Sequence, residues 1–564
     1  MELQSSEKMV RLQDIELNHM TMRTYLLISF MLLFNAGVIA QLAVVNPAEF
    51  EKNEGVLLVW DYSNSRDSIT ANIARHAQKE GKVWIIYYPG QAPADTAQIK
   101  DYLLSRGVTV ENLFFIPGWT ETLWIRDFGP LSAYASFGKG LRRFMYDPGY
   151  SAYGRPKDDS IPHQLARQWE WPPRNLGLEL EGGNLIFDGL WRGFGSKRIW
   201  EQNPGLTPDE IRLLLMDRFN LMDFIFLDNL NNSGGGIWKH VDMYMKVIDY
   251  ETILVSSYPD FLPDFPVIES IVGLLENTPT YFGKPYKVIR IPAPPKANGE
   301  WATTQNDEMR TYTNSLIINS TVIVPSYDLP DWDNQAKAIY EQNMPGYTIE
   351  MVDSRMLTIL GGAIHCITKE VPAAGFNRII HEKVTQGQAF EKDFVIGCLA
   401  SSDTTVFSMW LYYKMNDQET YTKVPVHLTC PLHFGVIENL QPDDTISYYL
   451  ELNTESDTIT YPLTAPEGSF TFWFNPVGLS EGITQNNDLK VYPNPASESI
   501  VIETIDWLES PMQLTISNLA GQIVFSVVLN ETKIEIDPDL PEGVYIINVS
   551  SQDRAFRSKL VIRK

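Results

Sequence analysis

Short apolar runs alternate with amphipathic stretches over residues 54–383. The run Val56-Leu57-Leu58-Val59-Trp60 is typical of a buried strand, and residues 68–78 have the spacing of a helix. A second apolar run, at residues 83–87, follows that stretch. Because strands that alternate with helices pack as a sheet covered by helices, the pattern predicts an α/β fold.

This strand–helix–strand unit recurs with different lengths along the same region. A variable repeat length argues against an open solenoid, so we expect a closed ring of units. Further strands are predicted at residues 185–187, 224–227, 243–247, 252–255, 287–290, 315–318, 322–324 and 348–350, and further helices at residues 208–218, 267–276 and 333–342.

The pattern changes after this region, where helical spacing gives way to short strands such as residues 410–413 and 446–450. Short strands separated by turn-rich breaks predict a β-sandwich of immunoglobulin type over residues 386–478. A polar linker at residues 479–488 and a last small β-sandwich at residues 489–564 complete the predicted organisation.

Residues 1–40 comprise an upstream segment and a predicted secretory signal peptide. Arg23 supplies its basic start, an apolar run follows, and Val38-Ile39-Ala40 supplies small residues for cleavage. The apolar run is too short for a comfortable membrane span, so we expect no transmembrane segment. The α/β region would then begin the mature chain and extend over residues 41–385.

The net charge limits the classes of molecule that this protein is expected to bind. The 564 residues carry a formal net charge of -25. Such an acidic chain is a poor match for nucleic acid, whose affinity depends on Lys and Arg, whereas it would attract cationic substrates. An acidic surface also promotes solubility, so charge alone does not choose between these explanations.

Three cysteines occur in a chain that is predicted to be exported. Cys398 and Cys430 lie in one later segment and could pair, which leaves Cys366 as the odd thiol. Cys366 follows Gly361-Gly362 and a short apolar segment, and glycines allow the backbone to approach a ligand closely. A lone cysteine is more often a buried structural thiol, but polar residues elsewhere in the α/β region favour a catalytic one.

Polar residues fall near the start of the first strand in several of the predicted units. Equivalent positions in a closed ring converge on its axis, so we expect these side chains to share one pocket. The residues are Asp127, Asn184, His240, Asp242, Asn314 and Cys366.

Several of these residues also have a simpler structural explanation. Asp127 follows Arg126 and would serve as a surface ion pair or a turn cap, while Trp124 would be a core residue. His240 and Asp242 alternate along a predicted strand, which would place both side chains on one face. A metal pair there lacks a further His or Cys cluster at ligand spacing, so a catalytic pair is preferred to a zinc site.

The combination of residues suits the chemistry of a guanidinium group. A guanidinium is planar and always charged, and carboxylates such as Asp127 and Asp242 meet it two hydrogen bonds at a time. The Cys366 thiolate would attack its central carbon, and His240 would protonate the departing ammonia. Because a cysteine is mostly protonated at neutral pH, a cation bound beside the sulfur would activate it.

Five motifs in this order resemble one enzyme family. They are Trp124-Ile125-Arg126-Asp127, Glu181-Gly182-Gly183-Asn184, His240-Val241-Asp242, Tyr312-Thr313-Asn314-Ser315 and the run from His365 to Glu370. Together they resemble the guanidine-modifying pentein enzymes, and within them the agmatine deiminase and Porphyromonas-type peptidylarginine deiminase group. The resemblance covers most of residues 50–385 and implies a five-fold pseudo-symmetric α/β propeller.

The resemblance implies a role for each matching residue. Cys366 corresponds to the nucleophile that forms a covalent amidino intermediate, and His240 to the general acid that afterwards activates water. Asp127 and Asp242 correspond to the carboxylates that bind the guanidinium, and Asn314 to a further residue of the catalytic pocket. The substrate-binding residues are expected to be Trp124, Arg155, Glu181 and Asn184. The resemblance implies no metal and no other cofactor.

The order of domains distinguishes the exported peptidylarginine deiminase of this group from the agmatine deiminases. The exported peptidylarginine deiminase carries the propeller, an immunoglobulin-like domain and a sorting module, and Val491-Tyr492-Pro493-Asn494-Pro495 resembles the opening of type IX secretion sorting domains. The implied partners are the type IX secretion machinery and an arginine-containing peptide, with a secreted or cell-surface location. Agmatine, which has no carboxylate, is the alternative substrate, because only Arg155 matches the two arginines that bind a substrate carboxylate in the exported enzyme. A secreted adhesin with an inactive propeller is the non-enzymatic alternative, against which the intact catalytic residues argue.

Overall fold

The computed structural model describes residues 44–474 and 489–562. Within these ranges it leaves out residues 91–95, 137–139, 152–153, 231–238, 305–306, 385, 389, 429–432, 495, 497–498, 505–511, 519–522, 530–532, 538–539, 542 and 551–554. The predicted signal peptide, the predicted linker and Cys430 therefore lie outside the described residues. Among the described residues, no helix is both long and apolar enough to cross a membrane.

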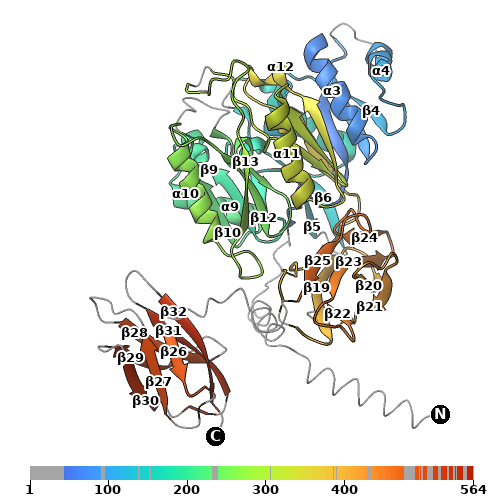
Figure 1. The fold of residues 1–564 in the computed structure, drawn as a ribbon. Helices are drawn as coiled ribbons and strands as arrows, with labels where there is room; N and C mark the ends of the chain where they lie inside the picture. The colour runs from blue at the N-terminus through green and yellow to red at the C-terminus, as the bar shows by residue number, and fades with distance from the viewer. Residues whose placement is uncertain are drawn as a thin grey trace, which may run out of the picture.

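The α/β region, residues 44–372, contains short strands and the main helices of the molecule (Figure 1). Its strands are β1 (Val44–Val45), β2 (Asn53–Val59), β3 (Lys82–Tyr87), β4 (Leu113–Pro117), β5 (Leu131–Ser136), β6 (Leu141–Asp147), β7 (Pro173–Asn175), β8 (Ile186–Phe187), β9 (Arg192–Ser196), β10 (Asp223–Leu227), β11 (Met245–Val247), β12 (Thr252–Ser257), β13 (Lys287–Pro292), β14 (Leu316–Ile318), β15 (Thr321–Ser326), β16 (Thr348–Asp353) and β17 (Lys369–Pro372). Its helices are α3 (Asn64–Ala77), α4 (Thr96–Ser105), α5 (Ile125–Phe128), α6 (Pro156–Asp159), α7 (Ile161–Trp169), α8 (Arg198–Gln202), α9 (Pro208–Phe219), α10 (Phe265–Glu276), α11 (Pro330–Asn343) and α12 (Arg355–Thr358), with 3-10 turns η2 (Gly182–Asn184), η4 (Val241–Met243) and η5 (His365–Ile367).

These strands form five separate sheets that share one pattern. Each sheet contains an antiparallel pair of strands, then a helical crossover that leads to a parallel strand. The hydrogen-bonded orders are β17-β2-β3-β4, β1-β5-β6-β7, β10-β9-β8, β11-β12-β13 and β14-β15-β16. The α/β class predicted from the sequence is therefore confirmed, and the recurring unit is visible as a repeated topology.

The crossover helices form because their apolar residues recur at helical spacing. In α10, Ile268, Ile271, Val272 and Leu275 are buried, and the helix packs against β12 and β13. These positions follow the i, i+3, i+4, i+7 pattern of one helical face. Helix α9 begins with a capping box, because its sequence places a Thr and a Glu at the spacing this cap requires.

The last strand of the α/β region returns to its first long strand. Strand β17 pairs antiparallel with β2, so that Lys369 lies opposite Leu57 and Val371 opposite Gly55. Residues more than 300 positions apart in the chain thus belong to one sheet. This pairing places the turn that carries Cys366 beside the start of the region.

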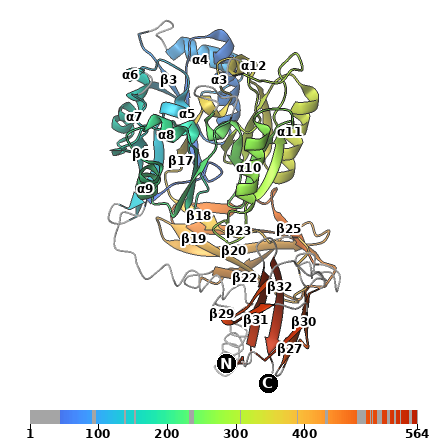
Figure 2. The same cartoon turned by 90° about the vertical axis from the view of Figure 1, so that its left-hand side faces the viewer.

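The β region, residues 377–474, has no helices among its described residues (Figure 2). Its two sheets have the orders β18-β19-β22 and β21-β20-β23-β24, and β25 also pairs with β23. Its strands are β18 (Asn377–Ile380), β19 (Phe394–Ser402), β20 (Val406–Met415), β21 (Thr422–Pro425), β22 (His433–Ile437), β23 (Thr445–Thr454), β24 (Thr458–Tyr461) and β25 (Phe470–Trp473). A buried ion pair joins it to the α/β region, because Arg378 Nε lies 2.6 Å from Glu51 Oε1. Cys398 is buried in this region and forms no disulfide with the other described cysteine, Cys366, while its pairing with Cys430 stays a prediction.

The C-terminal module, residues 489–562, consists of two further sheets around a core of its own. Their orders are β26-β27-β30 and β29-β28-β31-β32. The strands are β26 (Leu489–Tyr492), β27 (Ile500–Thr504), β28 (Met512–Asn518), β29 (Ile523–Leu529), β30 (Lys533–Ile536), β31 (Gly543–Ser550) and β32 (Ala555–Ile562). A separate core indicates a unit that is stabilised by its own packing.

Candidate functional site

The predicted catalytic residues lie in short turns that precede the first strand of an antiparallel pair. Asp127 is in α5 before β5, Asp242 is in η4 before β11, and Cys366 is in η5 before β17. His240 immediately precedes η4, and Asn314 lies two residues before β14. Because α5 contacts η2 and η5, and η2 contacts η4, turns from different sheets meet at one place. The structure therefore brings together the residues that the repeated pattern singled out.

One local prediction about this site is wrong. The sequence suggests that His240 and Asp242 share one face of a strand, but residues 241–243 form a 3-10 turn and β11 begins only at Met245. Neighbouring groups hold the turn, since the Val241 N–H donates to Asn184 Oδ1 at 3.2 Å. In this turn His240 contacts Glu181 and Asp127, whereas Asp242 contacts His365.

Gly183 leaves room at the centre of the site. A side-chain carbon at this position would lie 2.7 Å from Asp127 Oδ1, 2.9 Å from His240 Nδ1 and 3.2 Å from Asp242 Oδ2. Three functional atoms from two different turns, α5 and η4 with its preceding residue, therefore surround one point. Only glycine fits there without displacing at least one of them.

The Cys366 thiol lies beside an amide and a carboxylate. Asn314 Nδ2 donates to Cys366 Sγ at 3.3 Å, and Asn314 Oδ1 accepts the Cys366 backbone N–H at 3.3 Å. Asp242 Oδ2 lies 3.8 Å from the sulfur. A side-chain carbon at Gly362 would lie 2.7 Å from Trp124 Cζ3 and 3.0 Å from Sγ, so the indole and the thiol border the same narrow space.

His240 lies between two carboxylates and is fully buried. Its Nε2 forms an ion pair with Glu181 Oε2 at 2.9 Å, and its Nδ1 lies 3.4 Å from Asp127 Oδ1. Burial opposes the charged imidazole, but the Glu181 and Asp127 carboxylates together raise the pKa of His240 to about 9. The imidazole is therefore positively charged at neutral pH and can act as a proton donor.

The two carboxylates that contact His240 differ in their protonation. Burial raises the pKa of Asp127 to about 7, and the positive charge of His240 only partly opposes this effect. Burial acts on Glu181 in the same direction, but His240 and Arg198 outweigh it and lower the pKa of Glu181 below its ordinary range. Arg198 Nε donates to Glu181 Oε2 at 2.6 Å. Glu181 is therefore a permanent anion that holds His240, whereas Asp127 can gain or lose its proton.

Asp242 has one bound and one free oxygen. Its Oδ2 contacts His365 Nδ1 at 2.7 Å. Its Oδ1 is buried, and no donor among the described residues reaches it. Burial opposes ionisation, but the hydrogen bond from His365 lowers the pKa of Asp242. An ionised carboxylate with a free buried oxygen is suited to accept hydrogen bonds from a ligand.

The thiol is protonated as long as no cation lies beside it. Burial, together with the negative charges of Asp242 and Asp127, raises the pKa of Cys366 well above its ordinary value. A positive ligand between the two carboxylates would reverse both electrostatic contributions. The geometry therefore couples ligand binding to formation of the thiolate.

Comparison with known proteins identifies the family. The sequence profile of the Porphyromonas-type peptidyl-arginine deiminase family matches residues 45–372, which is more than half of the chain. The chain belongs to this family. An agmatine deiminase from Pseudomonas fluorescens is 28% identical over 295 residues, which cover 47% of this chain and 78% of the relative. A solved C. jejuni agmatine deiminase with substrate bound has a similar fold, with a TM-score of 0.51 and 19% identity over 60% of this chain and 99% of that chain.

A second profile concerns the end of the chain. The secretion system C-terminal sorting domain matches residues 490–563. This domain indicates export by the type IX secretion system to the cell surface or the extracellular space. Together with its family, it makes the chain an exported deiminase, a hydrolase that acts on C–N bonds of amidines.

Two of the predicted substrate-binding residues of this deiminase have other contacts. Asn184 Oδ1 accepts backbone N–H groups of Ser196 at 3.0 Å and Val241 at 3.2 Å, so its side chain braces neighbouring turns. Arg155 is half-buried and donates to the Tyr150 hydroxyl at 3.2 Å. Substrate binding by these residues stays a prediction.

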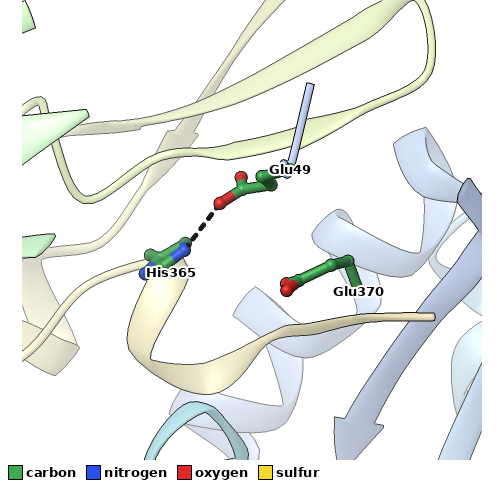
Figure 3. A group of neighbouring side chains, drawn as sticks. All are labelled: Glu49, His365 and Glu370. Carbon is green, nitrogen blue, oxygen red and sulfur yellow. Dashed lines mark hydrogen bonds and ion pairs between the residues drawn. The ribbon is translucent and has the colours of Figure 1, made fainter. Parts of the chain in front are cut away.

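Among the residues that the structure describes, two groups of side chains have the donor types of a metal site. They are Asp127, Glu181 and His240, and Glu49, His365 and Glu370 (Figure 3). In the second group Lys246 Nζ lies 2.6 Å from Glu49 Oε1 and 2.7 Å from Oε2, and Arg126 Nη2 lies 2.6 Å from Glu370. Protein cations already neutralise these carboxylates, so the donor set suits a salt-bridge network better than a divalent ion.

Two residues near the site were missed by sequence reasoning. His365 lies inside a quoted motif, but nothing in the sequence shows that its ring contacts Asp242. Glu49 belongs to no motif, and its contact with His365 joins positions 316 residues apart. The sequence offers one weak signal for Glu49, which is that this acidic residue lies shortly before the first predicted strand at residues 56–60.

Proposed function

We propose that this chain is an exported deiminase that converts peptidyl-arginine to peptidyl-citrulline and ammonia. The observation that carries the proposal is the free, buried Asp242 Oδ1 in a site shared with a thiol, an imidazolium and a second carboxylate. Such a constellation matches a flat cation with several N–H donors and an electrophilic centre. The family profile and the sorting domain support the same conclusion.

The guanidinium of the substrate would bind between the two aspartates. Asp242 Oδ1 would accept its N–H groups on one side and Asp127 on the other, and the Trp124 indole borders the same space. A cation held there lowers the pKa of the Cys366 thiol by removing the effect of two negative charges. Asp127 also favours its ionised form once the cation is bound.

The first chemical step forms a covalent intermediate. The Cys366 thiolate attacks the guanidinium carbon, and a C–S bond forms. His240 transfers its proton to one terminal nitrogen, the C–N bond breaks, and ammonia leaves. The product is a positively charged S-amidino cysteine that keeps the remaining substrate nitrogen, and the two carboxylates stabilise its charge.

The second step restores the enzyme. Neutral His240 takes a proton from a water molecule, and the hydroxide adds to the amidino carbon. The C–S bond then breaks and the thiolate leaves, while the added oxygen passes its remaining proton to the sulfur and becomes the carbonyl oxygen of a ureido group, which restores the thiol. Asn314 Nδ2, which donates to the sulfur at 3.3 Å, would stabilise the departing thiolate.

The domain organisation belongs to the same proposal. We assign residues 41–385 to the catalytic domain, with the five repeated sheets as the blades of a pentein propeller. Residues 386–478 would be an immunoglobulin-like domain and residues 489–564 the sorting domain, joined by the linker at residues 479–488. The separate sheets and core of the C-terminal module support its treatment as an independent unit.

Peptidyl-arginine is preferred because of the export signal and the family description. A protein outside the cell meets polypeptides, and the profile that matches is that of a peptidyl-arginine deiminase family. Agmatine is the second candidate, because the curated relative at 28% identity is an agmatine deiminase. That reaction would follow the same steps and yield carbamoylputrescine.

A substrate panel tests the proposal. Ammonia release would be measured with a short peptide ending in arginine, the same sequence with the arginine inside, free arginine and agmatine. We expect the highest kcat/KM for a peptide, and a colorimetric assay should detect its ureido product. The Cys366→Ala variant supplies the blank. Turnover of agmatine alone would overturn the peptide specificity and leave the deiminase chemistry intact.

A further inference from the structure

His365 connects the site to a second group of buried charges. Its Nδ1 contacts Asp242 Oδ2 at 2.7 Å. Its Nε2 contacts Glu49 Oε2 at 2.8 Å, the contact that Figure 3 shows. The ring is 2% exposed, so water has little access to it. Asp242, His365 and Glu49 thus form one continuous hydrogen-bonded chain that begins at the free carboxylate oxygen of the site.

The two contacts of His365 limit how its ring nitrogens can act as hydrogen-bond donors and acceptors. A neutral imidazole has one N–H and one lone pair, so it can donate to only one carboxylate. Both ring nitrogens of His365 face carboxylate oxygens at hydrogen-bond distance. With Asp242 and Glu49 ionised, each contact needs a proton from the ring. The geometry is therefore that of a ring with a carboxylate oxygen at hydrogen-bond distance from each nitrogen.

Glu49 is itself held firmly. Lys246 Nζ donates to both of its oxygens, and the Ile317 backbone N–H donates to Oε1 at 2.6 Å. Lys246 Nζ also donates to the Ser315 carbonyl at 2.5 Å. Ser315 follows Asn314, which donates to the thiol. Lys246 therefore connects Glu49, the partner of His365, to the segment that contacts Cys366.

The remaining charged groups around this chain come from several elements. Arg126 on α5 donates through Nε to the His365 carbonyl at 3.2 Å and pairs with Glu370 on β17. A cavity of about 50 Å³ borders His365, Glu49, Arg126 and Lys246. The titratable and charged groups facing the chain are Asp127, His240, Cys366, Lys246, Arg126, Lys369 and Glu370.

We infer that His365 is a positioning residue for the deiminase reaction, which fixes the Asp242 carboxylate through Oδ2 and leaves Oδ1 without a protein partner, so that it can accept a hydrogen bond from the substrate cation. Glu49 fixes the orientation of the His365 ring from its opposite side through the contact with Nε2. The inference rests on the proposed deiminase chemistry and names residues to which neither the motifs nor the comparisons give a role. His365 does not touch the reacting atoms, so it acts through Asp242.

The experiment compares His365→Ala, His365→Gln and Glu49→Gln with the unmodified protein. The matched control is His381→Gln, because His381 is also buried and also hydrogen-bonded at both nitrogens, to the Gly397 carbonyl and the Tyr448 hydroxyl, but lies in the β region. The kinetic constants kcat and KM would be measured as functions of pH. Chloroacetamidine, a small amidinium that alkylates a thiolate with loss of chloride, would report on Cys366 without any substrate tail.

Loss of the His365 ring should raise KM for the cationic substrate more than it lowers kcat. Loss of a hydrogen bond to a charged group should raise KM by about 10- to 100-fold in His365→Ala, with a smaller decrease in kcat. The acidic limb of kcat/KM, which Asp127 sets in the unmodified protein, should become steeper, because Asp242 without the hydrogen bond from His365 binds a proton more readily and then titrates in the same range. His365→Gln should recover part of the affinity, and Glu49→Gln should change KM and the acidic limb in the same direction to a smaller extent.

A purely structural role gives a different result. A drop in kcat/KM that is equal at every pH, or wild-type kinetics in His365→Ala, would overturn the inference. If His365→Ala does not fold, an unchanged KM and an unchanged acidic limb in both His365→Gln and Glu49→Gln would overturn it. If no member of the substrate panel is turned over, the rate of Cys366 alkylation in each variant still decides the role of His365.

Discussion

Replacing Gly183 with alanine should disable the site while the backbone stays the same. The added carbon would lie 2.7 Å from Asp127 Oδ1, 2.9 Å from His240 Nδ1 and 3.2 Å from Asp242 Oδ2. Ordinary contacts begin at 3.4 Å, so all three atoms have to retreat. The change therefore tests directly whether these groups act together.

None of the three groups can move without losing a partner. Asp127 Oδ1 accepts the Gly183 N–H at 3.2 Å, His240 is paired with Glu181, and Asp242 is held by His365. A misplacement of about 1 Å at a reacting centre costs about 100-fold in rate, so kcat/KM should fall by about that factor. Overpacking should also lower the free energy of unfolding by about 1–3 kcal/mol.

Steady-state kinetics and thermal unfolding of the purified protein would measure both effects. The control is Gly273→Ala, because Gly273 lies inside α10 and an added carbon there would meet nothing within 4 Å. That variant should keep full activity and gain about 0.5–1 kcal/mol of stability, since alanine favours a helix over glycine. Wild-type kcat/KM in Gly183→Ala would refute the placement of these atoms around one substrate position.

Three further results are expected. Cys366→Ala should abolish formation of the ureido product with an unchanged circular dichroism spectrum, and product at the normal rate would remove the thiol from the mechanism. The value of kcat/KM reports on the free enzyme, whose Cys366 thiol has a raised pKa, so it should rise with pH and most steeply below about 7, where Asp127 still carries a proton. It should level off above about 9, as His240 loses the proton it donates, and a flat profile over this range would contradict these roles. Glu51→Ala leaves the buried Arg378 without its carboxylate and should lower the free energy of unfolding by about 3–5 kcal/mol in denaturant titrations, whereas an unchanged midpoint would show that the pair adds no stability.

Periodicity predicted the elements of the α/β region but not how they pair. The apolar run that became β12 and the helical spacing that became α10 lie close to their predicted positions. Helix α3 begins at Asn64 rather than at residue 68, because its first turn is polar and carries no apolar spacing. The order of strands in each sheet depends on contacts between distant segments, which local patterns do not encode.

Residue type and motif order predicted most of the site. Cys366, His240, Asp127 and Asp242 are chemically conspicuous, and the structure places them in neighbouring turns. Their orientation was not predictable, since a period of two along residues 240–242 does not distinguish a strand from a 3-10 turn that is held by a neighbouring asparagine. Glu49 could not be found because its importance arises only from a contact made in the folded chain.

The pairing of β17 with β2 determines when the catalytic site of this protein can form. The sulfur follows Gly362 and precedes β17, so it meets its amide and carboxylate partners only after the last segment of the α/β region has come back to the first. A chain in which β17 has not yet paired with β2 therefore lacks an assembled nucleophile, even when every other part of the α/β region is in place.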